Sequence, residues 1–208
     1  MRICEIFRSI QGEGLTMGVP TVFVRTVGCN LDCSWCDTKY SFTGGEEKTI
    51  EQIMAEIGDC RTVCVTGGEP MIQKEIYDLL NALLKADKYI VLETNGAVDL
   101  KDVPVDQNIM ISMDIKCPSS GMSDRMVDSN IPLLSRKDQL KFVIKDQADL
   151  DYAVDYISKH NPDTNIVFTP VGGTDRLEWL VDSVLEKDLD VRILPQLHKI
   201  IWGEKRGV

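Results

Sequence analysis

The sequence predicts an α/β fold in which about six mostly parallel strands form a partial, open TIM-like barrel with a reduced number of helices. Segments rich in β-branched residues alternate along the chain with longer segments whose apolar residues recur at helical spacing, which is the pattern of consecutive βα units. Polar residues follow the apolar part of several strands, as expected at the rim of a barrel. Because about six strands are too few to close an eight-stranded barrel, one side should stay open to a substrate.

The composition describes a chain of ordinary domain size with an excess of acidic residues. Its 208 residues suit a single domain spanning 1–208. Lys and Arg number 23 against 33 Asp and Glu, which gives a net charge of −10. This balance argues against nucleic acid as a partner and favours a small molecule or a protein. The chain lacks both a long apolar run and the apolar core of a signal peptide, so we expect a cytoplasmic protein with no membrane partner.

The part of the chain up to residue 116 is expected to form five of the eight strands. Thr49 can cap the first helix, whose apolar residues Ile50, Ile53, Met54 and Ile57 share one face. The second helix carries leucines at helical spacing, which indicate a face buried in the core. The expected strands are 3–7, 21–27, 61–66, 88–93 and 109–116, and the expected helices are 50–57 and 72–86.

The second half continues the alternation. The segment 117–138 contains Pro118, Gly121 and Pro132 and is expected to be irregular. The segment 195–202 is unusually rich in apolar and hydrogen-bonding residues for a chain terminus, so it should pack against the rest of the domain. The expected strands are 139–145, 165–171 and 191–197, and the expected helices are 148–160 and 175–187.

A cysteine-rich loop follows the strand 21–27. Cys29, Cys33 and Cys36 have C-x3-C-x2-C spacing, so all three thiols can turn toward one point. A [4Fe-4S] cluster held by protein alone takes four thiolates, and a closed zinc site also takes four ligands. With three ligands, one iron would be open to a small molecule, which is the arrangement needed to bind and reductively cleave S-adenosylmethionine (SAM).

Two alternatives for this loop remain open at the level of sequence. One is a zinc site completed by a distant cysteine or by His160 or His198, and the other is an electron-transfer cluster completed by Cys60 or Cys117. The total of seven cysteines, an odd number in a chain without a secretory signal, favours metal chemistry over a disulfide framework. Cys64 lies in an alternating β-branched segment and is expected to pack as a small apolar residue, and the same is expected of Cys4.

Other strand ends carry groups suited to ligands. The loop Gln11-Gly12-Glu13-Gly14 lets the backbone approach a ligand while it presents an amide and a carboxylate. The Gly67-Gly68-Glu69-Pro70 turn leaves backbone donors and acceptors uncovered, as the zwitterionic end of an amino acid requires. Arg25 lies in a strand expected to line the barrel, and an inward-facing arginine needs an anion, for which a substrate carboxylate would serve.

The cysteine spacing, the aromatic Trp35 just before the third cysteine, and the Gly-Gly-Glu-Pro turn one strand–helix–strand unit later together resemble the radical SAM superfamily. A larger set of motifs distributed over nearly the whole chain resembles the 7-carboxy-7-deazaguanine synthase family. The motifs are Ile10-Gln11-Gly12-Glu13-Gly14, Val24-Arg25-Thr26, the three cysteines followed by Asp37-Thr38, Thr66-Gly67-Gly68-Glu69-Pro70, Glu93-Thr94-Asn95-Gly96, Pro118-Ser119-Ser120-Gly121 and Gln196-Leu197-His198-Lys199.

This resemblance implies a lyase that converts 6-carboxy-5,6,7,8-tetrahydropterin to 7-carboxy-7-deazaguanine with loss of ammonia, on the route to the queuosine or archaeosine bases of tRNA. It implies a [4Fe-4S] cluster, SAM that is regenerated after each turnover, and Mg²⁺. It also implies a homodimer and an electron donor of the flavodoxin or ferredoxin type. Reduction of SAM would yield a 5′-deoxyadenosyl radical that takes a hydrogen atom from the pterin.

The resemblance also assigns roles to residues. The cluster would be bound by Cys29, Cys33 and Cys36, and Mg²⁺ by Thr38. The substrate would contact Ile10, Gln11, Gly12, Glu13, Arg25, Thr66 and, as part of a lid, His198. SAM would contact Trp35, Cys36, Asp37, Gly68, Glu69, Glu93, Asp114, Ile115 and Lys116. The sequence departs from the family at Lys116-Cys117-Pro118, where a run similar to Ser-Pro-Lys is expected.

Two other functions compete with this hypothesis. A glycyl-radical enzyme activase also uses C-x3-C-x2-C, but it would need an open groove for a protein loop and has no evident use for Arg25. A non-catalytic iron–sulfur carrier or zinc-binding module leaves the Gly-Gly-Glu-Pro turn unexplained. Assay after anaerobic reconstitution distinguishes the three, since a carrier transfers electrons without a substrate and an activase acts on a partner enzyme.

Overall fold

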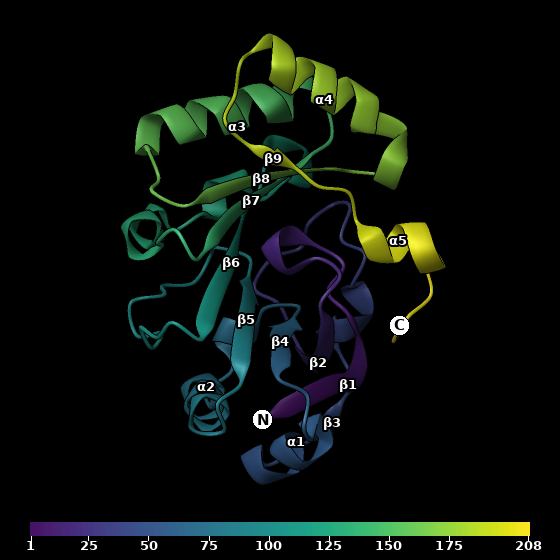
Figure 1. The fold of residues 1–208 in the computed structure, drawn as a ribbon, viewed down its shortest axis with the longest axis vertical. Coiled ribbons are helices and arrows are strands. Elements are labelled where there is room, and N and C mark those ends of the chain that lie inside the picture. The colour runs from purple at the N-terminus through teal and green to yellow at the C-terminus, as the bar shows by residue number, and fades with distance from the viewer.

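In the computed structural model, which describes residues 1–208, nine strands form one sheet in the order β3-β1-β2-β4-β5-β6-β7-β8-β9 (Figure 1). The seven strands β2, β4, β5, β6, β7, β8 and β9 are parallel to one another. β1 is antiparallel to both of its neighbours, β2 and β3. The strands are β1 (Arg2–Ile10), β2 (Pro20–Thr26), β3 (Glu46–Glu47), β4 (Thr62–Gly67), β5 (Tyr89–Thr94), β6 (Ile109–Ile115), β7 (Gln139–Ile144), β8 (Asn165–Pro170) and β9 (Arg192–Ile193).

The sheet has the open-barrel form that the sequence predicts. Its parallel strands follow one another in chain order, so each new strand is added on the same side of the last. The end strands β3 and β9 do not pair with each other, which leaves the barrel open. Six parallel strands, β2 and β4 to β8, have six or seven residues each. They correspond to the six core strands expected from the β-branched segments.

Helices cover the outer face of the sheet. Figure 1 shows α1 and α2 beside the early strands, and α3 and α4 beside β7 to β9. Apolar side chains of these helices and of the strands form a core of 34 buried residues. None of the helices combines the length and apolar composition of a membrane span. The helices are α1 (Ile50–Ile57), α2 (Ile76–Lys85), α3 (Gln147–His160), α4 (Leu177–Glu186) and α5 (Leu197–Trp202).

The inner face of the sheet has an apolar layer below a polar one. Side chains of a strand alternate between its two faces, so residues two positions apart share a face. Phe23, Cys64, Val91 and Met110, from four neighbouring strands, form a small buried cluster. Cys64 therefore packs as a small apolar residue, as expected. The polar layer lies two positions further along the same strands and consists of Arg25, Thr66, Glu93 and Ser112.

Two expectations for the ends of the chain were wrong in detail. β1 runs from Arg2 to Ile10 and pairs antiparallel with β2, so it extends beyond the strand expected over 3–7. The strand expected over 191–197 is only Arg192–Ile193. Its last sheet hydrogen bond runs from the Leu194 N–H to the Phe168 carbonyl, 3.0 Å. Pro195 has no N–H to continue the ladder, and the chain instead turns into α5.

The remaining elements agree closely with expectation. Thr49 caps α1 and forms a capping box with Gln52, in which each side chain bonds the backbone N–H of the other residue. α2 begins at Ile76 rather than 72, because Pro70–Ile72 form a separate 3₁₀ turn. The segment 117–138 is irregular and contains three short 3₁₀ turns. The two-residue strand β3 has no counterpart among the expected strands.

Replacement of Thr49 by Ala should lower the free energy of unfolding by about 1 kcal/mol, because the N–H of Gln52 loses its acceptor. Urea denaturation followed by circular dichroism measures this change. Thr49→Ser, which keeps the hydroxyl, should stay close to wild type. Equal losses in the two variants would show that the side-chain oxygen is not what stabilises the helix.

Candidate active site

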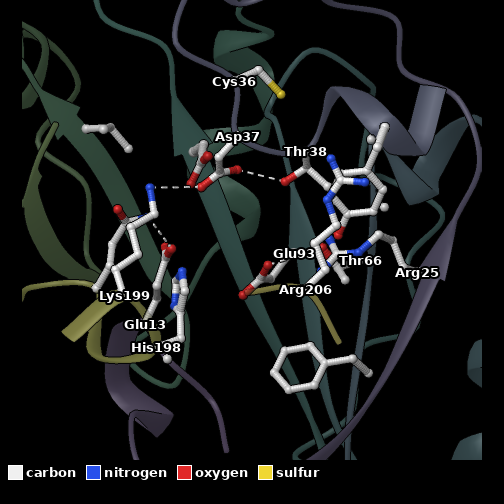
Figure 2. Close-up of a pocket in the computed structure, with 18 of the residues that line it drawn as sticks. Glu13, Arg25, Cys36, Asp37, Thr38, Thr66, Glu93, His198, Lys199 and Arg206 are labelled. Carbon is white, nitrogen blue, oxygen red and sulfur yellow. Dashed lines mark hydrogen bonds and ion pairs between the residues drawn. The ribbon is translucent and has the colours of Figure 1, made fainter. Parts of the chain in front are cut away.

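A cavity of about 440 Å³ opens on the polar layer of the inner face. Figure 2 shows side chains from the sheet, the cysteine loop and α5 pointing into this one space. Every residue to which the sequence assigned a site role lines the cavity, except Glu69 and Ile115. Ile115 belongs to the apolar core on the other face of the sheet. The structure therefore brings the expected cluster, cofactor and substrate residues together.

The cysteine loop forms one wall of the cavity. Cys29, Cys33 and Cys36 are free thiols and all three line the space. Burial raises the pKa of the Cys29 and Cys33 thiols. A Cβ on Gly68 would lie 2.7 Å from Cβ of Cys29 and 2.4 Å from the Gly28 carbonyl oxygen. Only glycine therefore lets the end of β4 approach the cysteine loop this closely.

Most of the residues that could supply a fourth metal ligand lie outside the cavity. Cys60, Cys117 and His160 do not line the cavity, whereas His198 does. His160 stacks on Tyr156, with 4.4 Å between ring centroids. No group of three or more Cys, His, Asp and Glu side chains converges closely enough to hold a single metal ion. Three thiols on one loop, with no fourth thiol beside them, fit a cluster that keeps one position for a small molecule.

Glu69, which was expected to contact SAM, does not line the cavity. Its side chain is fully buried below the cavity wall. One oxygen accepts hydrogen bonds from the Met71 N–H and the Thr94 hydroxyl, both at 2.9 Å, and the other accepts from the Asn95 N–H at 2.6 Å. Burial raises the pKa of Glu69 to about 7, although these donors oppose the shift. The carboxyl group therefore ties the end of β4 to the end of β5.

Glu93, which was expected to contact SAM, lies among the residues that were expected to contact the substrate. It accepts hydrogen bonds from the Gln11 amide at 3.1 Å and the Thr66 hydroxyl at 3.2 Å. The side-chain oxygen of Gln11 in turn accepts from the Gly12 N–H at 2.8 Å. Burial raises the pKa of Glu93, with Lys141 opposing the shift. The result is a polar edge of alternating donors and acceptors, suited to a heterocycle.

A chain of buried charges crosses the cavity. Lys141 on β7 contacts Glu13 at 2.5 Å and Asp114 at 3.2 Å, and Asp114 contacts Lys116 at 2.6 Å. Burial alone would lower the pKa of Lys141, but Asp114 and Glu13 outweigh it and hold the pKa well above its usual range. Burial would raise the pKa of Asp114, and the two lysines lower it instead.

Lys141 was missed in the sequence. A signal was present, because it is a lone charge in the middle of an apolar strand, like Arg25. The same reasoning that placed Arg25 in the cavity would have placed Lys141 there.

Arg25 points inward, as expected, and already has one carboxylate partner. Its Nε donates to Glu5 at 2.8 Å, and the Tyr40 hydroxyl donates to the same oxygen at 2.9 Å. The guanidinium carbon lies 6.0 Å from the ring centroid of Phe7 and 5.9 Å from that of Tyr40. The two terminal nitrogens have no hydrogen bond within the protein. Glu5 thus fixes the guanidinium and leaves its outer edge free for an anion.

Neither Glu5 nor Tyr40 was identified from the sequence. Glu5 lies directly opposite Arg25 in the β1–β2 register, which the pattern of single strands does not reveal. Burial raises the pKa of Tyr40 to about 12.

The segment around α5 closes one side of the cavity. The Leu197 N–H donates to the Gly12 carbonyl at 2.9 Å, and the Gln196 amide donates to Glu13 at 2.7 Å. A Cβ on Gly12 would lie 2.2 Å from Nδ1 of His198, so the imidazole lies directly on this glycine. Lys199 pairs with Asp37 of the cysteine loop at 3.2 Å (Figure 2). The segment therefore joins two loops that the sequence alone would leave separate.

Known proteins resemble this chain over its whole length. A family model described as the radical SAM superfamily matches residues 23–118. The 7-carboxy-7-deazaguanine synthase of Thermoplasma acidophilum is 40% identical over 210 residues, covering 100% of both chains. That of Methanospirillum hungatei JF-1 is 44% identical over 207 residues, covering 97% of this chain and 85% of the relative. The crystal structure of QueE from Escherichia coli superposes with a TM-score of 0.74 at 23% identity, covering 92% of each chain.

The buried carboxyl of Glu69 predicts a pH-dependent stability. Its folded-state pKa of about 7 exceeds the usual 4.5, so the folded state holds a proton that the unfolded state releases. The stabilisation is complete below pH 4.5 and is lost as the pH rises to 7, a change of about 3 kcal/mol. Urea unfolding of the metal-free protein at several pH values, compared with Glu69→Gln, measures this difference. Parallel profiles for the two proteins would contradict it.

Proposed function

The chain belongs to the 7-carboxy-7-deazaguanine synthase family of radical SAM enzymes, and on this basis we propose that it converts 6-carboxy-5,6,7,8-tetrahydropterin to 7-carboxy-7-deazaguanine with release of ammonia. The enzyme is a lyase whose family uses a [4Fe-4S] cluster and SAM. Its product would serve the synthesis of queuosine or archaeosine in tRNA. The main support is that the cysteine loop, the inward Arg25 and the polar edge around Gln11 and Glu93 all open into one cavity.

The residues of the cysteine loop suit the cluster and SAM. When bound, these groups supply an electron and a radical able to abstract hydrogen, which is chemistry that no side chain provides. Cys29, Cys33 and Cys36 would hold the cluster. The exposed backbone of Gly68 would receive the amino group of SAM, and the Asp114–Lys116 pair would lie beside its polar end.

The opposite part of the cavity suits the carboxypterin. The free terminal nitrogens of Arg25 would bind the carboxylate as a bidentate pair. Gln11, Glu93 and Thr66 offer amide, carboxyl and hydroxyl groups to the edge of the ring. Glu13 would support the site indirectly, since Lys141 and Gln196 already contact its carboxylate oxygens.

The α5 segment would act as the lid over the substrate. His198 would cover the ring from this segment, which lies against the loop of Gly12 through the Leu197 hydrogen bond. Ile10 and the Gly12 backbone complete this side of the cavity. Closure here would exclude water from a reactive intermediate.

Thr38 is the proposed Mg²⁺ ligand. It lines the cavity, and its hydroxyl donates to Asp37 at 2.7 Å, so its oxygen lone pairs are still available to a cation. Mg²⁺ prefers hard oxygen ligands, and it commonly takes one or two from the protein and the rest from water and substrate. The substrate carboxylate and water would supply the other ligands, so that metal and substrate would bind together.

The wider setting is also part of the proposal. We infer a single-domain homodimer that operates in the cytoplasm and receives electrons from a protein of the flavodoxin or ferredoxin type. Family membership gives no support to the glycyl-radical activase or to the non-catalytic carrier or zinc-binding module.

The direct test of this function is turnover. Anaerobically reconstituted protein, supplied with SAM, Mg²⁺, a reductant and 6-carboxy-5,6,7,8-tetrahydropterin, should form 7-carboxy-7-deazaguanine and ammonia, detected by liquid chromatography with mass spectrometry. SAM should be recovered rather than consumed. Fully loaded protein that leaves the pterin unchanged would contradict the proposed function.

Arg25→Lys should weaken substrate binding by about 2–5 kcal/mol, because an ammonium cannot form the bidentate contact in a desolvated site. Binding is measured by calorimetry on the loaded enzyme. Arg8→Lys is the matched control, since Arg8 is an exposed residue of β1 that does not line the cavity. If Arg25→Lys binds the carboxypterin as tightly as the control, Arg25 does not hold the carboxylate.

Thr38→Ala should reduce the stimulation of turnover by Mg²⁺ without loss of iron or change in the visible spectrum. Thr38→Ser keeps the hydroxyl oxygen and should retain the response. Turnover is measured across a Mg²⁺ titration, with chelator as the starting point. A Thr38→Ala variant that keeps the wild-type Mg²⁺ dependence would show that the ligand lies elsewhere.

A further inference from the structure

Asn95 lies between the end of β5 and the cysteine loop, and no role has yet been given to its side chain. The residue is 6% exposed. Its amide nitrogen donates to the Asn30 side-chain oxygen at 2.8 Å and to Sγ of Cys29 at 3.7 Å. Each of its two amide hydrogens can therefore be donated to one of these acceptors. The side chain reaches a cysteine that the proposed function makes a cluster ligand.

The orientation of this amide is fixed by its other contacts. The Asn95 oxygen accepts from the Ala97 N–H at 2.9 Å. A flipped amide would place its NH₂ group against that N–H and its oxygen against the oxygen of Asn30, so both contacts would become unfavourable. Asn30 is oriented in turn, because its amide nitrogen donates to the Ala97 carbonyl at 3.2 Å. The N–H of Asn95 therefore faces the sulfur of Cys29.

Asn95 is held in place from below. Its backbone N–H donates to Glu69 at 2.6 Å. The next residue, Gly96, has φ of +75°, and a Cβ there would lie 2.5 Å from the Asp114 carbonyl oxygen. The turn after β5 is thus hydrogen-bonded to Glu69 and lies close against β6. The side chain of Asn95 is therefore held beside the cysteine loop.

The three cysteines are not equivalent in their hydrogen bonds. Cys29 receives both N–H···S bonds of the loop, from Asn95 and from the backbone N–H of Leu31 at 3.4 Å. Hydrogen bonds to ligand sulfurs stabilise the more negatively charged, reduced state of an iron–sulfur cluster and raise its reduction potential. Asn95 supplies the bond that a side-chain substitution can remove.

We propose that Asn95 is a positioning residue that sets the reduction potential of the cluster through its hydrogen bond to Sγ of Cys29. The inference rests on the proposed function, because it requires a cluster on this loop. Asn95 need touch neither the substrate nor SAM for this role. The effect should be present in the resting enzyme before either ligand binds.

The test is an anaerobic redox titration of the loaded enzyme without SAM or substrate, followed by electron paramagnetic resonance. Asn95→Leu keeps the shape of the side chain and removes the donor. It should lower the equilibrium constant for one-electron reduction by up to about tenfold, a shift of about 59 mV to more negative potential. The visible spectrum and iron content should stay as in wild type.

Asn130→Leu is the matched control. Asn130 is also buried and holds the loop after β5 through the Val98 carbonyl and the Leu100 N–H, without contact to sulfur. It should leave the potential unchanged. An equal shift in both variants, or no shift in Asn95→Leu, would overturn the proposal.

A second measurement covers the case in which Asn95→Leu does not hold the cluster. Wild-type protein with ¹⁵N in its asparagine side chains should show a ¹⁵N coupling to the reduced cluster by electron–nuclear double resonance. Absence of that coupling would also overturn the proposal. A wild-type protein that holds the cluster but forms no product would contradict the proposed function alone, so the two failures can be told apart.

Discussion

The buried chain of charges from Glu13 through Lys141 and Asp114 to Lys116 is the constraint on which the site depends. Removing ions from water costs several kcal/mol for each, and this cost is offset only when each charge has a close partner. Here the partners come from the loop after β1, from β7 and from the end of β6. Loss of Lys141 would leave the buried carboxylate of Glu13 without its lysine partner, whereas Asp114 would keep Lys116. The loop that carries Gln11 and Gly12 is therefore held against the far side of the barrel by electrostatics rather than by sheet hydrogen bonds.

The alternation of side chains explains how the inner face of one sheet carries both a packed apolar layer and an open polar cavity. Phe23 and Cys64 form the apolar layer with two further residues. The residues two positions further along the same strands are polar. Arg25 and Thr66 therefore point into the cavity without any change in strand geometry. Gly67 then lets the end of β4 lie close to Thr26 of β2, and Gly68 lets the next residue lie close to the cysteine loop. Glu69 turns away from the cavity and ties β4 to β5. Each feature follows from its position along a strand.

The sequence predicted what depends on local pattern. The parallel strands, the cap of α1 and the inward side of Arg25 follow from periodicity, and the cysteine spacing identified the loop. It did not predict contacts between distant segments. Glu5 can be assigned only when the strand register is known, and the contacts of Gln196 and Lys199 depend on where α5 docks. Lys141 could have been assigned by the reasoning that was used for Arg25. Pro195 follows shortly after the last strand, which ends at Ile193, so the expectation of a strand up to residue 197 was wrong. The burial of Glu69 below the cavity wall could not be predicted, because spacing does not reveal which way a side chain turns.

We propose that the cluster, SAM and the carboxypterin share the cavity between the cysteine loop and α5. A crystal structure of the anaerobically reconstituted protein with SAM and 6-carboxy-5,6,7,8-tetrahydropterin tests it most directly. The pterin carboxylate should lie on the terminal nitrogens of Arg25, with the ring edge within hydrogen-bond distance of Gln11 and Thr66. Substrate bound outside this cavity, or with its carboxylate turned away from Arg25, would contradict this arrangement.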